Sequence, residues 1–107
     1  MQEATIHLLD SHKMIEFYVN RDINSLATGL FVEGFYTQSR VVAVAETRGE
    51  DVAEELFDLT NNPCRQAERE RLYGRGRSLS VGDIVEVAGD MFVCASHGWH
   101  QIDITLV

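Results

Sequence analysis

Residues 78–102, SLSVGDIVEVAGDMFVCASHGWHQI, form the stretch around which the rest of the chain is organised. The run IVEV at 84–87 is rich in β-branched residues that suit a pleated strand, and FVC at 92–94 resumes the same preference. Between them, Ala-Gly-Asp at 88–90 supplies the residue types of a tight turn. The stretch therefore predicts a β-hairpin.

A third strand is predicted at the end of the chain, in QIDITLV at 101–107. Ile102, Ile104 and Leu106 alternate there with polar residues, which is the period-2 pattern of a half-buried strand. Gly98 marks the turn before it. The last third of the chain is thus expected to be a three-stranded antiparallel meander.

The same stretch carries a family resemblance. GRSLSVGDIVEV at 76–87, followed by FVC at 92–94 and GWHQI at 98–102, resembles the C-terminal signature of YodL-like proteins, and LTNN at 59–62 is similar to a segment of their phage-borne members. These are small accessory proteins encoded by bacteriophages and other bacterial mobile elements. The resemblance implies an accessory role and supplies no catalytic residues.

The first half of the chain contains four apolar runs. Those at 4–9 and 14–20 predict two strands paired as a hairpin, because a polar cluster of turn type separates them. The run at 26–34 is interpreted as a strand interrupted by glycines, and the valine-rich run at 40–47 as a buried, central strand.

Two helices are expected between these strands and the hairpin. Thr47 and Glu50 have the spacing of a capping box, and apolar residues across 51–60 fall on one helical face. Pro63 ends this helix and can open a second one, capped by Asn62. That second helix is predicted to run to Tyr73 on a thin apolar face of Cys64, Ala67 and Leu72, with a flexible segment at 74–78 beyond it.

Together these elements predict an α+β fold. It comprises a small mixed or antiparallel sheet of five to six strands, with one or two helices inserted before the C-terminal meander. A length of 107 residues, 45% hydrophobic content and a single proline fit one folded domain over residues 1–107. There is no bilayer-length apolar run and no signal peptide at the first residues, so we expect a protein of the bacterial cytoplasm whose two cysteines are free thiols.

The net charge of −8 is divided unevenly along the chain. Residues 63–77 hold five arginines and two glutamates, a local charge of +3, whereas the remaining four basic and fifteen acidic residues carry −11. An acidic body disfavours generic binding to DNA or to anionic membrane. It favours a basic protein partner, or serves solubility alone.

Cys94, His97 and His100 are the cluster whose residue types suit a metal, and Cys64 could complete four zinc ligands. The same cysteine and His97 are also the types needed for a nucleophile and its base. The alternative is an ordinary core cysteine beside surface histidines, because paired zinc motifs and an orienting third group are lacking. We therefore predict no metal ligand set, no cofactor and no catalytic residue.

The arginine segment at 65–77 admits two interpretations. Guanidinium groups can grip oxyanions, which would make the segment a docking surface or a nucleic-acid contact. Alternatively, Arg65 pairs with Glu68 and Glu68 with Arg71 within the helix. Tyr73 is its lone aromatic residue, and the acidic remainder would repel a long nucleic acid, so nucleic-acid binding is not expected.

The leading hypothesis is a non-enzymatic accessory protein that binds a host or rival protein. Such a partner could be a defence nuclease whose basic groove the acidic body would occupy, as in an anti-CRISPR or antirestriction protein. A homodimer is compatible with this role. A metal- or small-ligand-binding protein and a nucleic-acid-contacting regulator are the alternatives. The predicted partner-binding residues are Asp51, Glu54, Glu55, Asp58, Arg65, Arg69, Arg71, Arg75 and Trp99.

Overall fold

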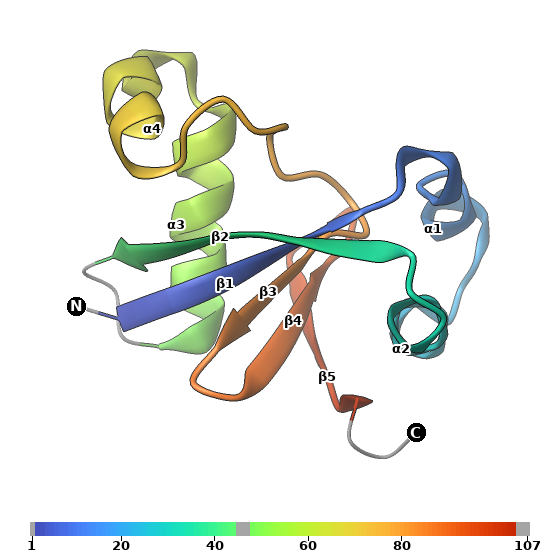
Figure 1. Cartoon of the computed structure of the whole chain (residues 1–107). Coiled ribbons are helices and arrows are strands. Elements are labelled where there is room, and N and C mark those ends of the chain that lie inside the picture. The colour runs from blue at the N-terminus through green and yellow to red at the C-terminus, as the bar shows by residue number, and fades with distance from the viewer. Residues whose placement is uncertain (1, 45–47, 105–107) are drawn as a thin grey trace.

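The computed structural model describes residues 2–44 and 48–104, and over them it contains five strands, four α-helices and two short 3-10 helices (Figure 1). In chain order these are β1 (Gln2–Leu9), η1 (Ser11–Lys13), α1 (Glu16–Val19), α2 (Ile23–Val32), β2 (Tyr36–Val44), α3 (Gly49–Asn61), η2 (Pro63–Arg65), α4 (Gln66–Leu72), β3 (Ile84–Val87), β4 (Asp90–Cys94) and β5 (Trp99–Ile102). The predicted α+β class is confirmed.

The strands form one sheet in the order β2-β1-β3-β4-β5, and each neighbouring pair is antiparallel. β1 lies inside the sheet: Ala4 is paired with Val42 of β2 on one side and with Val87 of β3 on the other. The strand β1 is thus held in the sheet by the β3–β4 hairpin, which lies far from it in the sequence.

The predicted C-terminal meander is confirmed as β3, β4 and β5. Ala88 and Gly89 join β3 to β4 with φ of 51° and 87°, the positive values of a type I′ hairpin turn. The third strand, β5, begins at Trp99 and ends at Ile102. It is therefore shorter and earlier than the strand predicted at 101–107, of which residues 105–107 lie outside the described part of the chain.

Helices cover both faces of the sheet, as Figure 1 shows. On one face, α3 contributes Val52, Leu56 and Leu59 to a core with sheet residues such as Val85 and Trp99. On the other, Phe17 of α1 and two residues of α2 pack on Leu9, Ile84, Val93 and Ile102. Successive side chains along β3 and β4 point to opposite faces of the sheet, so these two strands contribute residues to both cores.

The strand predicted at 14–20 is wrong, because residues 16–19 form α1, which follows directly after η1. The Asp10 side chain accepts a hydrogen bond from the His12 amide at 2.9 Å and so starts a helical turn. Phe17 alone in α1 is buried, while Ile15, Tyr18 and Val19 are exposed. β1 consequently has no hairpin partner in this segment and pairs with β2 instead.

The strand predicted at 26–34 is also wrong, because residues 23–32 form α2. The Asp22 side chain caps this helix by accepting bonds from the amide and hydroxyl of Ser25, at 3.2 and 2.9 Å. Ala27 and Leu30 are buried three residues apart, and Gly34 ends the segment with φ of 89°. These cap signals outweigh the weakening effect of glycine within the run.

The valine-rich run was expected to form a central strand, but β2 is an edge strand that begins earlier, at Tyr36. Its register against β1 shifts between Thr5 and His7, where β2 carries one extra residue. Val42 and Val44 face the core, whereas Val41 is 53% exposed. The valine content of a strand alone does not show whether that strand lies at the edge or in the centre of the sheet.

The two predicted helices are present with small corrections. α3 is capped at Arg48 without a side-chain bond, and Thr47 of the predicted capping box lies outside the described residues. The second helix begins as η2, where Asn62 accepts from the Cys64 amide as predicted, and continues as α4. Its apolar face is thinner than predicted, because Cys64 and Ala67 are both exposed.

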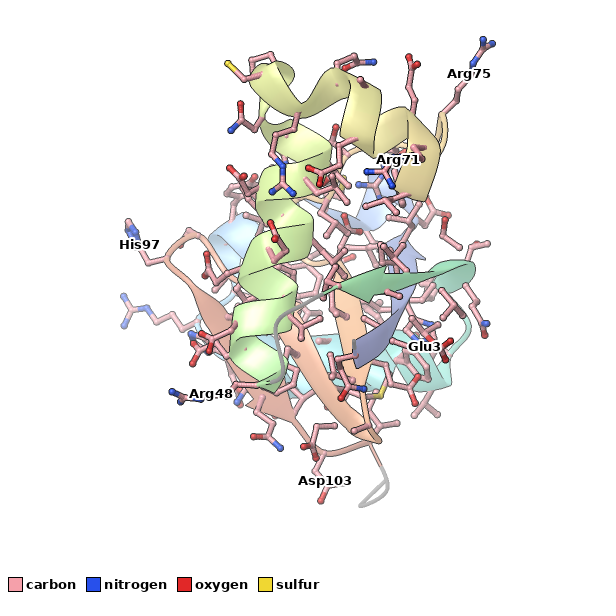
Figure 2. All side chains as sticks on the ribbon, turned by 90° about the vertical axis from the view of Figure 1, so that its left-hand side faces the viewer. Glu3, Arg48, Arg71, Arg75, His97 and Asp103 are labelled. Carbon is pink, nitrogen blue, oxygen red and sulfur yellow. The ribbon has the colours of Figure 1, made fainter. Side chains whose placement is uncertain are left out.

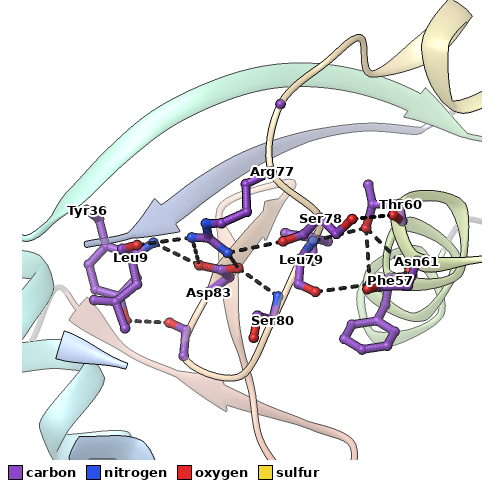
Figure 3. Close-up of polar contacts among 12 residues, drawn as sticks. Leu9, Tyr36, Phe57, Thr60, Asn61, Arg77, Ser78, Leu79, Ser80 and Asp83 are labelled. Carbon is purple, nitrogen blue, oxygen red and sulfur yellow. Dashed lines mark hydrogen bonds and ion pairs between the residues drawn. The ribbon is translucent and has the colours of Figure 1, made fainter. Parts of the chain in front are cut away.

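The segment at 74–78, predicted to be flexible, is instead tied to its surroundings. Arg69 donates to the Gly74 carbonyl at 2.9 Å, and the Tyr73 hydroxyl donates to the Arg77 carbonyl at 2.5 Å. Ser78 donates to the Thr60 carbonyl at 2.6 Å, at the C-terminal end of α3 (Figure 3). The acceptors in these bonds are backbone carbonyls. Every residue carries one, so the residue types of the segment did not indicate these bonds.

Candidate functional site

The acidic surface predicted on α3 is present at its N-terminal half. Asp51 and Glu54 are exposed, as is Glu50, and Arg48 comes within 3.8 Å of Asp51 at the start of the helix (Figure 2). Carboxylates in the first turns also interact favourably with the helix dipole. This half of α3 therefore presents accessible negative charge.

The C-terminal half of that surface is neutralised from within the chain. Arg65 binds Glu55, and it also lies 2.9 Å from Asp58 and 2.5 Å from Glu68. Hydrogen bonds to these three carboxylates, first to Glu55, raise the pKa of Arg65 above its ordinary value. The predicted Arg65–Glu68 pair is confirmed, but among the described residues Arg71 forms no ion pair with Glu68.

The other arginines of the segment divide into half-buried and exposed ones. Arg69 donates to the carbonyls of Thr60, Gly74 and Gly76 and lies 5.2 Å from the centre of the Tyr73 ring, so it has a structural role. Arg71 and Arg75 are exposed, and Figure 2 shows Arg75 projecting beyond the end of α4. The segment therefore does not present a continuous basic stripe.

Two members of the predicted partner-binding set meet in one concavity. A hollow of about 140 Å³ lies between α3 and the turn at 95–98, lined by Glu54, Phe57, Cys94, Ala95, Ser96, Gly98 and Trp99. We call it the α3 hollow. The Phe57 and Trp99 rings meet edge to face, with centroids 6.5 Å apart and planes at 83°. The hollow thus combines one exposed carboxylate with two aromatic rings.

The tryptophan in this hollow is held firmly. Trp99 is 7% exposed and belongs to the core under α3, and it pairs with Cys94 across β4 and β5. The turn before it is closed by a bond of 2.9 Å from the Ala95 amide to the Gly98 carbonyl, with Gly98 at φ of 80°. Trp99 is therefore a fixed lining residue, not a projecting anchor.

The other side of the same turn borders a second hollow. It measures about 330 Å³ and is lined by Phe17, Tyr18, Asn20, Arg21, Ile23, Ala95, Ser96, His97 and His100. We call it the α1 hollow. Ala95 and Ser96 line both hollows, so the turn stands as a partition between them.

The candidate metal ligands do not converge. Cys94 is buried, whereas His97 and His100 are exposed, and the described residues hold no group of three metal-binding side chains. Burial, with smaller contributions from the charges of Asp83 and Glu54, raises the pKa of the Cys94 thiol to about 12. Since the thiolate is both the metal ligand and the nucleophile, this thiol suits neither role.

A buried polar network holds the start of the C-terminal hairpin (Figure 3). Asp83 is fully buried and accepts bonds from the amides of Leu9 and Ser80 at 2.8 and 2.7 Å, and from the Arg77 guanidinium. Tyr36 donates its hydroxyl to the Gly82 carbonyl at 2.6 Å. Because its members bond one another and the backbone, we assign the network a structural role.

Comparison of the chain with protein-family models, with curated proteins and with solved structures found no match. Over the described residues, none of the helices has the length and apolar character needed to cross a bilayer. The site is therefore interpreted from its own chemistry.

Glu54 and Trp99 were predicted from the sequence to bind a partner but not to be neighbours, and Phe57 was not predicted to line the site. Glu54 and Phe57 are three residues apart on α3, so a common helical face was foreseeable. The packing of β5 beneath that face was not, because it depends on the sheet order.

Proposed function

We propose that this chain is a protein-binding accessory protein whose α3 hollow receives a basic side chain of its partner. It would act by binding and not by catalysis, in the cytoplasm of a bacterial host, as the resemblance to YodL-like proteins implies. The observation that carries the proposal is the meeting of Glu54, Phe57 and Trp99 in one concavity.

This combination of groups suits an organic cation. A carboxylate forms strong, charge-assisted hydrogen bonds with a guanidinium or ammonium group. Aromatic rings attract the same cations, tryptophan most strongly, when the cation lies near the ring. A hollow of about 140 Å³ offers room for the end of one arginine or lysine side chain. Arginine fits best, because its planar head can stack on a ring while it bonds the carboxylate.

The surroundings of the hollow support a basic partner. Glu50 and Asp51 are exposed near Glu54, and the chain as a whole carries −8. A field of one sign steers a partner of opposite charge and raises its association rate. We therefore propose a partner with an exposed basic surface, of which the DNA-binding groove of a defence nuclease is the example that fits the accessory role.

The tryptophan provides a direct test, since Trp99 is the single tryptophan of the chain. We expect its fluorescence to change saturably when the peptide Ac-Gly-Arg-Gly-NH2 is titrated. A peptide with neutral citrulline in place of arginine should bind up to about fivefold more weakly, the upper end of what an exposed charge pair contributes.

Two matched variants make the test specific. Glu54→Gln should weaken the arginine peptide about fivefold, whereas Glu3→Gln, an exposed residue on the far flank of the molecule in Figure 2, should leave it unchanged. Equal binding of the citrulline peptide, or an unaltered Glu54→Gln variant, would overturn the proposal.

The partner class is tested separately with purified restriction and RNA-guided nucleases. DNA cleavage should be inhibited by the chain and by Glu3→Gln, and restored when Glu54→Gln is used. If none of the nucleases is inhibited while the arginine peptide still binds, the basic partner belongs to another class of protein.

A further inference from the structure

We propose that the α1 hollow binds a carboxylate carried by a short apolar segment of a partner protein. This site lies on the other side of the turn at 95–98 from the α3 hollow, and its chemistry is opposite. The inference goes beyond the proposed function and does not rest on it.

The polar lining of the α1 hollow includes cationic and hydrogen-bond-donating groups from three parts of the chain, besides Asn20 and Ser96. Arg21 comes from the connection between α1 and α2, His97 from the turn, and His100 from β5. All three are exposed, and Arg21 forms no ion pair within residues 2–44 and 48–104. Although the chain carries a net charge of −8, this guanidinium has no acidic partner among those residues, so it is available to bind a carboxylate of another molecule.

The acidic side chains nearest in sequence are already engaged. The Asp22 carboxylate is used in the cap of α2, where it accepts from Ser25. Glu16 lies 3.6 Å from Lys13, on the preceding part of the chain. Neither interaction involves Arg21, so a carboxylate of a partner would not displace an internal bond.

An apolar ridge borders the hollow. Ile15, Tyr18 and Val19 are 64%, 61% and 76% exposed, and their spacing places them along one side of α1. Tyr18 belongs to both the ridge and the lining of the hollow. Large apolar side chains gathered on a small acidic protein are typical of a contact surface.

These two features specify the occupant. A carboxylate satisfies Arg21 and the imidazole N–H donors, and flanking leucine-like side chains would cover the ridge. A nucleic acid offers phosphates but would meet the repulsion of an acidic body. An acidic residue set among apolar residues, on an exposed helix or loop of a partner, matches both the charge and the apolar surface.

The test uses isotope-labelled protein and the peptide Ac-Leu-Glu-Leu-NH2. We expect saturable NMR shift changes in the amides of residues 18–23 and 96–100. The matched peptide Ac-Leu-Gln-Leu-NH2 should bind about fivefold more weakly, as should Arg21→Gln with the glutamate peptide. Tyr18→Ala should weaken both peptides, because it removes the apolar contact.

Two further variants serve as controls. Arg75→Gln, at an exposed arginine beyond α4, should bind the glutamate peptide normally, and so should Glu3→Gln, at an exposed carboxylate of β1 that lines neither hollow. Equal binding of both peptides, or normal binding by Arg21→Gln, would overturn the proposal. So would inorganic phosphate binding as tightly as the peptide, or a duplex oligonucleotide binding more tightly than either.

Discussion

Arg77 and Asp83 form a two-pronged ion pair, with Nη1 2.7 Å from Oδ2 and Nη2 2.8 Å from Oδ1. The same Nη2 donates to the Leu9 carbonyl at 3.0 Å, and Asp83 accepts from the Leu9 amide. The pair thereby fastens the end of β1 to the segment that enters β3. Its loss should loosen the contact between the end of β1 and the segment before β3.

We expect Arg77→Ala to lower the free energy of unfolding by about 2–3 kcal/mol, because it leaves the fully buried Asp83 carboxylate without its cation. The value lies below that of a completely buried pair since Arg77 is 35% exposed. Urea denaturation measures the change. The exposed Arg75 serves as the control, and Arg75→Ala should shift stability by no more than about 0.5 kcal/mol. Equal stability of the two variants would contradict the assignment.

The glycines of two turns should respond differently to alanine. Gly82 has φ of 95°, and an added Cβ would lie 2.7 Å from Leu9 Cδ2 and 3.0 Å from Phe17 Cδ2. Gly89 has φ of 87° with open space around it. Gly89→Ala should therefore cost only the conformational strain of about 1–2 kcal/mol, and Gly82→Ala distinctly more. Thermal unfolding compares the two, and an equal loss would mean that the loop relaxes around Gly82.

The first residue of the β3–β4 turn offers a stabilising change. Ala88 has φ of 51°, which an alanine adopts at a cost and which asparagine or glycine tolerates better. Ala88 is exposed, so its replacement should disturb no packing. Ala88→Asn is expected to raise the free energy of unfolding by about 0.5–1 kcal/mol, seen as a higher urea midpoint. A lower midpoint would show that the methyl group has a packing role.

The two thiols should differ in reactivity. Cys64 is exposed and should react rapidly with a thiol reagent, whereas Cys94 should react only as the protein unfolds. The pKa of Cys94 is raised to about 12, so folding favours its neutral form. That contribution to stability is complete below pH 9 and is lost as the pH rises toward 12. Raising the pH from 7 to 9 should therefore leave the Cys94 rate low.

The control for this experiment is Cys64→Ser, which should show the slow phase alone. A rapid second phase in that variant would place Cys94 within reach of solvent. The corresponding Cys94→Ser change introduces a hydroxyl into the core, and we expect it to destabilise the fold.

The C-terminal half of the fold was predictable because its signals are local. Turn residues such as Gly89 and Gly98 mark the ends of strands in the meander. Apolar spacing together with Pro63 defined α3 and the start of η2, which leads into α4. Each signal acts within a few residues of its element. The alternation of Val85 and Phe92 with their neighbours then fixed the buried faces.

The N-terminal half was not predictable from apolar content alone. The runs holding Phe17 and Leu30 are apolar enough for strands. Single side chains start the helical segments, because Asp22 caps α2 and Asp10 caps η1, the turn that precedes α1. The edge position of β2 depends on partners far away in sequence. The composition of a segment does not indicate which distant segment it will pair with.

The candidate site was likewise predictable only in part from the sequence. Glu54 and Trp99 were identified as residues of interest, because an exposed helical carboxylate and a turn tryptophan are recognisable types. Their neighbourhood, and the placement of Arg21 beside His100, arise only when β5 packs between α2 and α3. The structural role of Arg69 was hidden for a related reason, since its acceptors are backbone carbonyls.

The internal position of β1 has a consequence for biosynthesis. Ala4 is paired with Val87, so β1 waits for β3, which is synthesised much later. A nascent chain can pair β1 with β2 early, but the opposite edge of β1 stays open until the β3–β4 hairpin leaves the ribosome. The sheet can therefore close only once β3 and β4 have emerged. Until then the apolar residues of β1 are exposed in the form that chaperones bind.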